Sequence, residues 1–233
     1  MTGNGSMRAI VAEFLGTFAL VFVGAGAVVV NAWTNSGLGL VGVALANALV
    51  FAVMVTTMMN ISGGHLNPAI TVGLWVAKKT DGKTAVLYVI TQLTAAIVGA
   101  LALRVLFPAI EGEATAWGTP KISTELSIWQ AIALEAIMTL FLVSAFFGTI
   151  VSRDAPRVGG FAVGLVLLFI ILAGGPLTGG VANPARAFGP AIIARDFEGH
   201  AAYWIGPLLG GLVAGGLWGR VLLPRGEGQK GLR

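Results

Sequence analysis

The stretch GGHLNPAIT occupies residues 63–71, and the similar stretch GGVANPARA occupies residues 179–187. Both follow the pattern Gly-Gly-x-x-Asn-Pro-Ala. Asn is a strong helix N-cap, and Pro is favoured at the first helical position because it lacks an amide hydrogen and presets φ. The pattern therefore predicts one helix starting at Asn67-Pro68 and another at Asn183-Pro184. The glycine pairs in front of them favour irregular backbone.

The composition around these stretches is that of a membrane protein. Charged residues make up 10% of the chain and the mean hydropathy is +0.88, whereas soluble domains carry roughly 25% charged residues. A spanning helix needs about 20 apolar residues. The pattern predicts six such helices, at 8–31, 38–60, 84–107, 127–151, 159–176 and 201–223. The apolar pieces at 67–77 and 183–194 are too short to cross as helices, so we expect them to be half-helices.

The two halves of the chain resemble each other. AEFLGTFALVF from Ala12 matches LEAIMTLFLVS from Leu134, and each half reads as span, span, short piece, span. Because three crossings make up each half, the second half must enter from the opposite face. We therefore predict an all-α membrane protein with six transmembrane helices and two re-entrant half-helices in an inverted 3+3 repeat. It forms one domain over 1–233, with halves at 7–110 and 127–224 joined by an outer loop at 108–126.

Loop charges predict the orientation, because cytoplasmic loops gather Lys and Arg. With both termini inside, the cytoplasmic side holds ten of the 14 basic residues: Arg8, Lys78, Lys79, Lys83, Arg153, Arg157, Arg220, Arg225, Lys230 and Arg233. This distribution argues against a nucleic-acid partner despite the basic pI. With no cysteine and two histidines, a metal site is not expected. No cofactor and no enzymatic nucleophile are predicted either.

The two half-helices have an electrostatic consequence. If they enter from opposite faces, their N-termini meet near the membrane midplane, where two helix ends of roughly half a positive charge each disfavour a cation. Each capping asparagine still offers its amide to the space between them. We expect neutral molecules to pass this point and charged ones to be excluded.

The duplicated boxes Asn67-Pro68-Ala69 and Asn183-Pro184-Ala185, the two Glu-bearing half-starts and the segment NPARAFGPA resemble the aquaporin and glycerol-facilitator family, also called major intrinsic proteins. The resemblance is to a bacterial-type member. It implies a passive channel for water and small neutral solutes such as glycerol, urea, ammonia and boric acid, which excludes protons and ions. It also implies a homotetramer in the cell membrane, with a pore in each subunit.

Arg186 lies three residues after Asn183, in an apolar half-helix. A charge at membrane depth marks a functional site facing a cavity, and the resemblance places Arg186 in an outer constriction. The other three constriction positions carry over as Asn47, Ile171 and Gly180. This set lacks the Phe and His of water-selective bacterial members and the two aromatics of glycerol facilitators. We therefore expect a wider mouth of mixed polarity.

Glu13 and Glu135 could be proton carriers or cation ligands, as in an ion-coupled secondary transporter, which is the alternative function. The resemblance instead makes them structural acids that accept hydrogen bonds from the loop backbone. It also implies that loop backbone lines the pore, at Gly63, Gly64, His65, Thr178, Gly179 and Val181. A purely structural membrane protein is not excluded by sequence, but it has no evident need for Arg186.

Overall fold

The computed structural model describes residues 3–223, and every regular element within that range is helical. Six helices are long and apolar enough to cross a membrane, as predicted. They are α1 (Gly3–Trp33), α2 (Gly39–Met58), α4 (Gly82–Leu106), α6 (Ile128–Phe146), α7 (Phe161–Thr178) and α9 (Ala202–Leu217). Single π-helical turns extend α6 over Phe147–Val151 and α9 over Trp218–Leu222.

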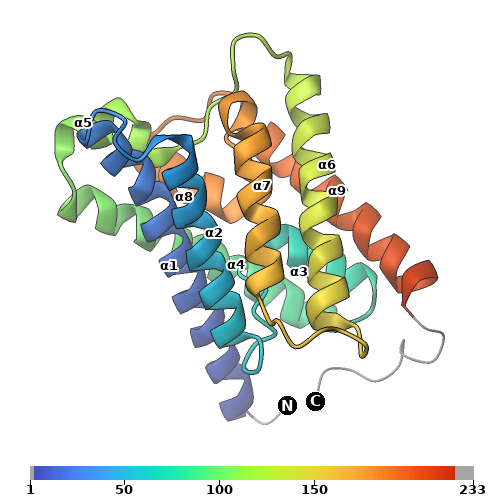
Figure 1. Cartoon of the computed structure of the whole chain (residues 1–233). Helices are drawn as coiled ribbons and strands as arrows, with labels where there is room; N and C mark the ends of the chain where they lie inside the picture. The colour runs from blue at the N-terminus through green and yellow to red at the C-terminus, as the bar shows by residue number, and fades with distance from the viewer. Residues whose placement is uncertain (1–2, 224–233) are drawn as a thin grey trace.

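The two predicted half-helices are also present, as α3 (Pro68–Val76) and α8 (Pro184–Ala194). Figure 1 shows them at different heights in the molecule, flanked by the six long helices. The outer loop contains two elements that the sequence pattern did not indicate, the short helix α5 (Ala109–Ala114) and a 3₁₀ turn at Ala116–Gly118. The fold is thus an all-α membrane fold with an inverted repeat and two re-entrant half-helices.

Each half-helix packs against the third long helix of the other half, α3 on α9 and α8 on α4. Glycines make the close approach possible. A Cβ at Gly211 or Gly215 of α9 would collide with the carbonyl oxygen of Ala69 or Gly73 in α3. A Cβ at Gly189 of α8 would collide in the same way with the carbonyl oxygen of Ala96 in α4. Gly211 and Gly215 therefore serve packing within one chain.

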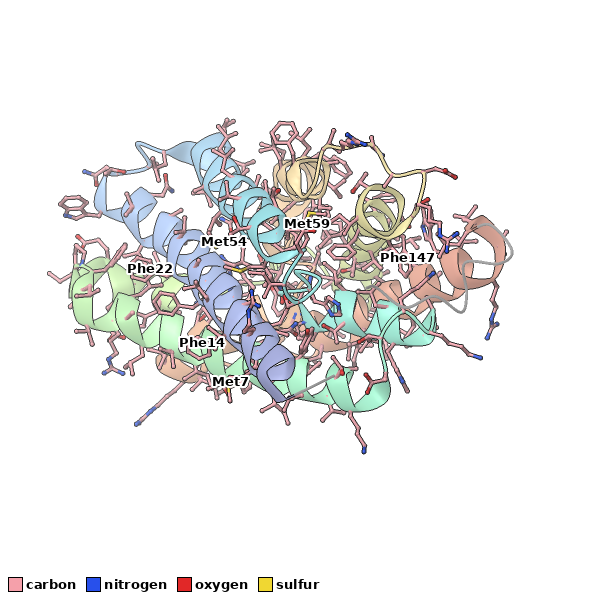
Figure 2. The ribbon with its side chains drawn as sticks, turned by 90° about the horizontal axis from the view of Figure 1, so that it is seen from below. Met7, Phe14, Phe22, Met54, Met59 and Phe147 are labelled. Atoms are coloured by element: carbon pink, nitrogen blue, oxygen red, sulfur yellow. The ribbon has the colours of Figure 1, made fainter. Side chains whose placement is uncertain are left out.

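Apolar packing surrounds the half-helices on both sides. In Figure 2 Phe22 lies between α1 and α4, where its ring centroid is 5.5 Å from that of Phe107. Phe147 belongs to a larger buried cluster formed by α2, α3, α6 and α7, and Met54 packs against that cluster. The outward faces of the long helices remain apolar, as the exposed Val53 of α2 and Phe169 of α7 illustrate. Such faces suit a lipid solvent.

Helix α1 begins and α9 ends on the same side of the molecule, toward the lower edge of Figure 1. An even number of crossings requires this. The connection between α6 and α7, which carries Arg153 and Arg157, lies on that side too. Residue 224 and the tail residues that contributed to the predicted orientation, Arg225, Lys230 and Arg233, lie outside the described residues.

Candidate functional site

Both half-helices start at their predicted asparagine caps. The side-chain oxygen of Asn67 accepts a hydrogen bond from the amide of Ala69 at 2.8 Å. That of Asn183 accepts from the amides of Ala185 at 3.0 Å and Arg186 at 3.3 Å. Proline follows each cap at the first helical position, where its missing N–H leaves no partner unsatisfied.

The two caps are also tied to each other's loops. Nδ2 of Asn67 donates to the carbonyl of Ala182 at 2.8 Å, and Nδ2 of Asn183 donates to the carbonyl of Leu66 at 3.1 Å. A primary amide carries two hydrogens, so one hydrogen of each asparagine is committed to the opposite loop. The sequence predicts that the whole amide of each cap faces the central space, whereas the structure leaves one hydrogen of each amide for that space.

The loop in front of each cap has left-handed backbone at the same three places. In the first loop Gly63, Gly64 and Leu66 have φ values of 93°, 64° and 50°. In the second loop the corresponding values are 90°, 59° and 47°, at Gly179, Gly180 and Ala182. The non-glycine residues in this region are strained, and such strain persists only where surrounding contacts impose it.

Two buried glutamates hold the two loops in this strained conformation. The carboxylate of Glu13 accepts hydrogen bonds from the amides of His65 at 2.9 Å and Leu66 at 2.7 Å. The carboxylate of Glu135 accepts from the amides of Val181 at 3.1 Å and Ala182 at 2.8 Å. Both side chains are 0% exposed. The contacts are those expected of structural acids that hold the loops.

Side chains that the sequence analysis did not single out complete these networks. Gln92 donates to Glu13 at 2.8 Å and to the Thr71 hydroxyl at 3.1 Å. The hydroxyls of Tyr88 and Tyr203 donate to the carbonyls of Ser62 and Thr178, each at 2.9 Å. Tyr88 and Tyr203 occupy equivalent places near the starts of α4 and α9. The internal repeat in the sequence therefore could have indicated their shared role.

His65 braces the first loop. Its Nδ1 lies 3.1 Å from Oγ1 of Thr71, and that hydroxyl donates to the carbonyl of Asn67 at 3.0 Å. Because the hydroxyl hydrogen is used there, His65 is the donor of the pair. No group of three or more His, Asp or Glu side chains within residues 3–223 is arranged to hold a metal ion. The contacts of His65 and Thr71 link the loop to the first turn of α3.

A cavity of about 290 Å³ extends from the two box asparagines to the outer loop. All four predicted constriction residues line it: Asn47, Ile171, Gly180 and Arg186. So do Gly179 and Val181 of the second loop, whereas Gly63, Gly64, His65 and Thr178 are not among its lining residues. One wall is apolar, formed by Leu20, Phe51, Leu142 and Leu167. Polar groups on the lining include the side chains of Asn67, Asn183 and Arg186.

The guanidinium of Arg186 is held by the outer loop. Its Nη1 donates to the carbonyl of Gly118 at 2.8 Å, and the residue is 9% exposed. Gly118 and the preceding Trp117 are both left-handed, with φ of 77° and 54°. A Cβ at Gly118 would lie 2.7 Å from the carbonyl oxygen of Ala25 in α1, so only glycine fits there. Sequence reasoning missed this carbonyl, because it lies 68 residues before the arginine.

The rim of the cavity carries one ion pair. Nζ of Lys121, which lines the cavity, lies 3.4 Å from Oδ2 of Asp196. Next to Asp196, His200 packs against Phe188, Phe197 and Tyr203. Burial lowers the pKa of His200 below its ordinary value, and the charge of Asp196 offsets part of that effect.

Comparison with known proteins shows which family this architecture resembles. The family model for major intrinsic proteins matches residues 1–218. Aquaporin TIP2-1 of Arabidopsis thaliana is 38% identical over 230 residues, covering 95% of this chain and 90% of that protein. Aquaporin TIP2-2 of Zea mays is 40% identical over 228 residues, covering 94% and 88%. The X-ray structure of the aquaglyceroporin from Plasmodium falciparum matches with a TM-score of 0.79 at 26% identity, covering 93% of this chain and 97% of that one.

Proposed function

Because the chain belongs to the major intrinsic protein family and is a passive membrane channel for water and small solutes, we propose that Asn47, Ile171, Gly180 and Arg186 form its outer selectivity filter. The observation that carries the proposal is that these four residues, taken from α2, α7, the second loop and α8, line one cavity. That cavity continues inward to Asn67 and Asn183. We also propose that the whole chain forms one channel domain.

The filter's composition supports passage of solutes larger than water. Gly180 has no side chain, Ile171 is aliphatic, and no aromatic ring is among the four. Arg186 supplies hydrogen-bond donors and a positive charge. We therefore propose that urea, ammonia, glycerol and boric acid pass in addition to water, in an order that their size and hydrogen bonding decide.

Ion exclusion follows from two positive regions placed in series. Arg186 repels cations at the filter, and the N-termini of α3 and α8 repel them at the centre. One free amide hydrogen on each of Asn67 and Asn183 can bind the oxygen of a passing water. A water held in this way has little capacity left to accept a proton from its neighbour. We propose that these residues block protons as well as metal cations.

The ion-coupled transporter has less support. Such a protein needs acidic groups at its central binding site, and within residues 3–223 no Asp or Glu lines the cavity. The two buried glutamates bind the amides of their own loops instead. These contacts favour a passive channel.

The proposal also covers assembly and placement. We propose a homotetramer in the cell membrane with both termini in the cytoplasm. The apolar outward faces of α2 and α7 suit lipid and neighbouring subunits. The basic loops Lys78–Lys83 and Arg153–Arg157 support the orientation, because Lys and Arg gather on the cytoplasmic side.

Stopped-flow measurements on proteoliposomes test the proposed filter. Water, urea, ammonia, glycerol and boric acid are compared in parallel, with protein-free vesicles and Ile171→Trp as controls. We expect a low activation energy for water and solute fluxes above the vesicle background. The indole should reduce the flux of glycerol and urea more than that of water. A bilayer-like activation energy, or equal loss of every flux in Ile171→Trp, would contradict the proposal.

A further inference from the structure

The side-chain nitrogen of Asn47 is bound to the protein backbone. Its Nδ2 donates to the carbonyl of Gly24 in α1 at 3.2 Å and to the carbonyl of Val43 one turn earlier in α2 at 2.9 Å. The side chain is 3% exposed. Both amide hydrogens are therefore used. The amide oxygen lies nearest to Gly24, so the whole amide group is seated against α1.

The position that receives this amide is a glycine. A Cβ at Gly24 would collide with Oδ1 of Asn47 and lie 3.0 Å from its Cγ. Gly24 is buried in the middle of α1 and its φ is not in the left-handed region. Glycine is unfavourable in a helix interior relative to alanine, and the backbone here does not require it. The space that the missing side chain leaves, which we call the Gly24 notch, is what accommodates Asn47.

We propose that Gly24 is a specificity-determining residue of this channel, acting as a positioning residue for Asn47. The Gly24 notch holds the Asn47 side chain against α1 and so sets the width of the filter. This inference rests on the proposed filter, because Asn47 affects selectivity only if solutes pass beside it.

The width of the filter then decides which solutes pass. Urea and glycerol are larger than water, so a narrower filter should reduce their passage more than that of water.

Adding a methyl group at Gly24 should displace Asn47. Because Asn47 lines the cavity and α1 lies behind it, the displaced side chain moves toward the cavity and narrows the filter. Gly26 provides the matched control on the same helix. A Cβ there would lie 3.0 Å from Cδ2 of Leu103 and 3.2 Å from the Phe107 ring, neither of which lines the cavity.

The test is a double-mutant cycle in proteoliposomes, using Gly24→Ala, Asn47→Ala and the pair. The readout is the ratio of urea permeability to water permeability, with glycerol to water as a second ratio. We expect Gly24→Ala to lower both ratios several-fold and Gly26→Ala to leave them at the wild-type values. In the Asn47→Ala background, Gly24→Ala should have no further effect, because the side chain that it displaces is gone.

A drop that persists in the Asn47→Ala background would overturn the proposal, as would unchanged ratios in well-folded Gly24→Ala. The ratio of solute permeability to water permeability does not depend on how many channels fold. A substitution that only reduces the number of folded channels therefore leaves this ratio constant. Should Gly24→Ala fail to fold, Asn47→Leu serves instead. It has nearly the same shape but cannot donate to the Gly24 carbonyl, so both ratios should fall, and unchanged ratios would refute the role of the notch.

Wild-type flux separates this inference from the proposed function. If the wild-type channel passes water but neither urea nor glycerol, the proposed solute range is wrong. In that case the same double-mutant cycle tests the role of the Gly24 notch, with water permeability per channel as the readout. A reduction in Gly24→Ala that disappears in the Asn47→Ala background supports the notch, and a reduction that stays refutes it.

Discussion

The side-chain amide of Asn67 donates a hydrogen bond to the backbone carbonyl of Ala182, 2.8 Å away and 115 residues later in the chain. The reciprocal bond from Asn183 to the carbonyl of Leu66 measures 3.1 Å. Each half-helix cap thus anchors the loop that precedes the other. Because both acceptor residues have left-handed backbone, the bonds help to hold two strained loops in place at the centre of the pore.

Asn183→Asp should weaken the exclusion of charge. The carboxylate can still cap Ala185 and Arg186, but it cannot donate to Leu66, and it places a negative charge between the two positive helix ends. We expect higher proton and K⁺ leakage, measured in proteoliposomes with an internal pH dye and a K⁺ gradient. The exposed Asn60→Asp is the matched control. Equal leakage in both variants would show that the centre is not the charge barrier.

Arg186→Val should increase cation passage at the outer filter. The substitution removes the charge and leaves the Gly118 carbonyl without its 2.8 Å partner. We expect larger fluxes of methylammonium and protons, and larger solutes should also enter more easily. The exposed Arg195→Gln, near the end of the same half-helix segment, should match wild type. If the selectivity of Arg186→Val is unchanged, Arg186 is not part of the filter.

Glu135→Gln should destabilise the fold. Solute flux should be independent of a proton gradient in both the wild-type protein and this variant. The carboxylate accepts hydrogen bonds from Val181, Ala182 and the Thr178 hydroxyl, and an amide offers one acceptor oxygen fewer. We expect a loss on the order of 1–3 kcal/mol, seen as a lower thermal unfolding midpoint in detergent. The exposed Glu125→Gln should be neutral. Proton-coupled solute uptake that vanishes in Glu135→Gln would instead indicate a carrier role.

His200 should make stability depend on pH. Burial lowers its pKa in the folded protein below the ordinary histidine value of about 6.5. The unfolded chain therefore binds more protons in the window just below that value, and stability falls as the pH drops through it. We expect the unfolding midpoint to decrease between about pH 7.5 and 5, and His200→Gln to flatten this dependence. An identical pH profile for the two proteins would contradict the assignment.

Mercurials should not inhibit the channel directly. They attack thiolates, and the sequence contains no cysteine. Thr119→Cys places a thiol on the outer loop at the lining of the cavity, so that variant should lose water permeability on mercurial treatment and recover it with a reductant. Inhibition of the wild-type protein would show that another group is attacked.

The elements that sequence reasoning predicted rest on local chemistry. Asn67-Pro68 and Asn183-Pro184 start helices because the cap and the proline act on the next few backbone amides. Span lengths follow from runs of apolar residues that must cover the hydrocarbon core. Asn47, Ile171, Gly180 and Arg186 were assigned by resemblance, and the structure brings all four to one cavity. The helix at Ala109–Ala114 was missed, because six residues carry too little periodic pattern.

The interactions that sequence reasoning missed join residues far apart in the chain. The carbonyl of Gly118 that holds Arg186 belongs to a left-handed backbone run that packs against α1. The direction of the Asn47 amide depends on the empty space at Gly24, 23 residues earlier. Gln92 reaches Glu13 across 79 residues. Nothing in the local pattern around any of these residues indicates the partner.

By itself the sequence determined the six crossings and the two opposed half-helices, since each depends on hydrophobic length or on capping by near neighbours. Only the tertiary structure decided which hydrogens of Asn67 and Asn183 remain for a solute, where Arg186 is held, and that backbone carbonyls take both amide hydrogens of Asn47. The physical reason is that hydrogen bonds and packing space are shared across the chain. The residue type gives the chemistry of a side chain, but the donors and acceptors that remain free depend on what packs against it.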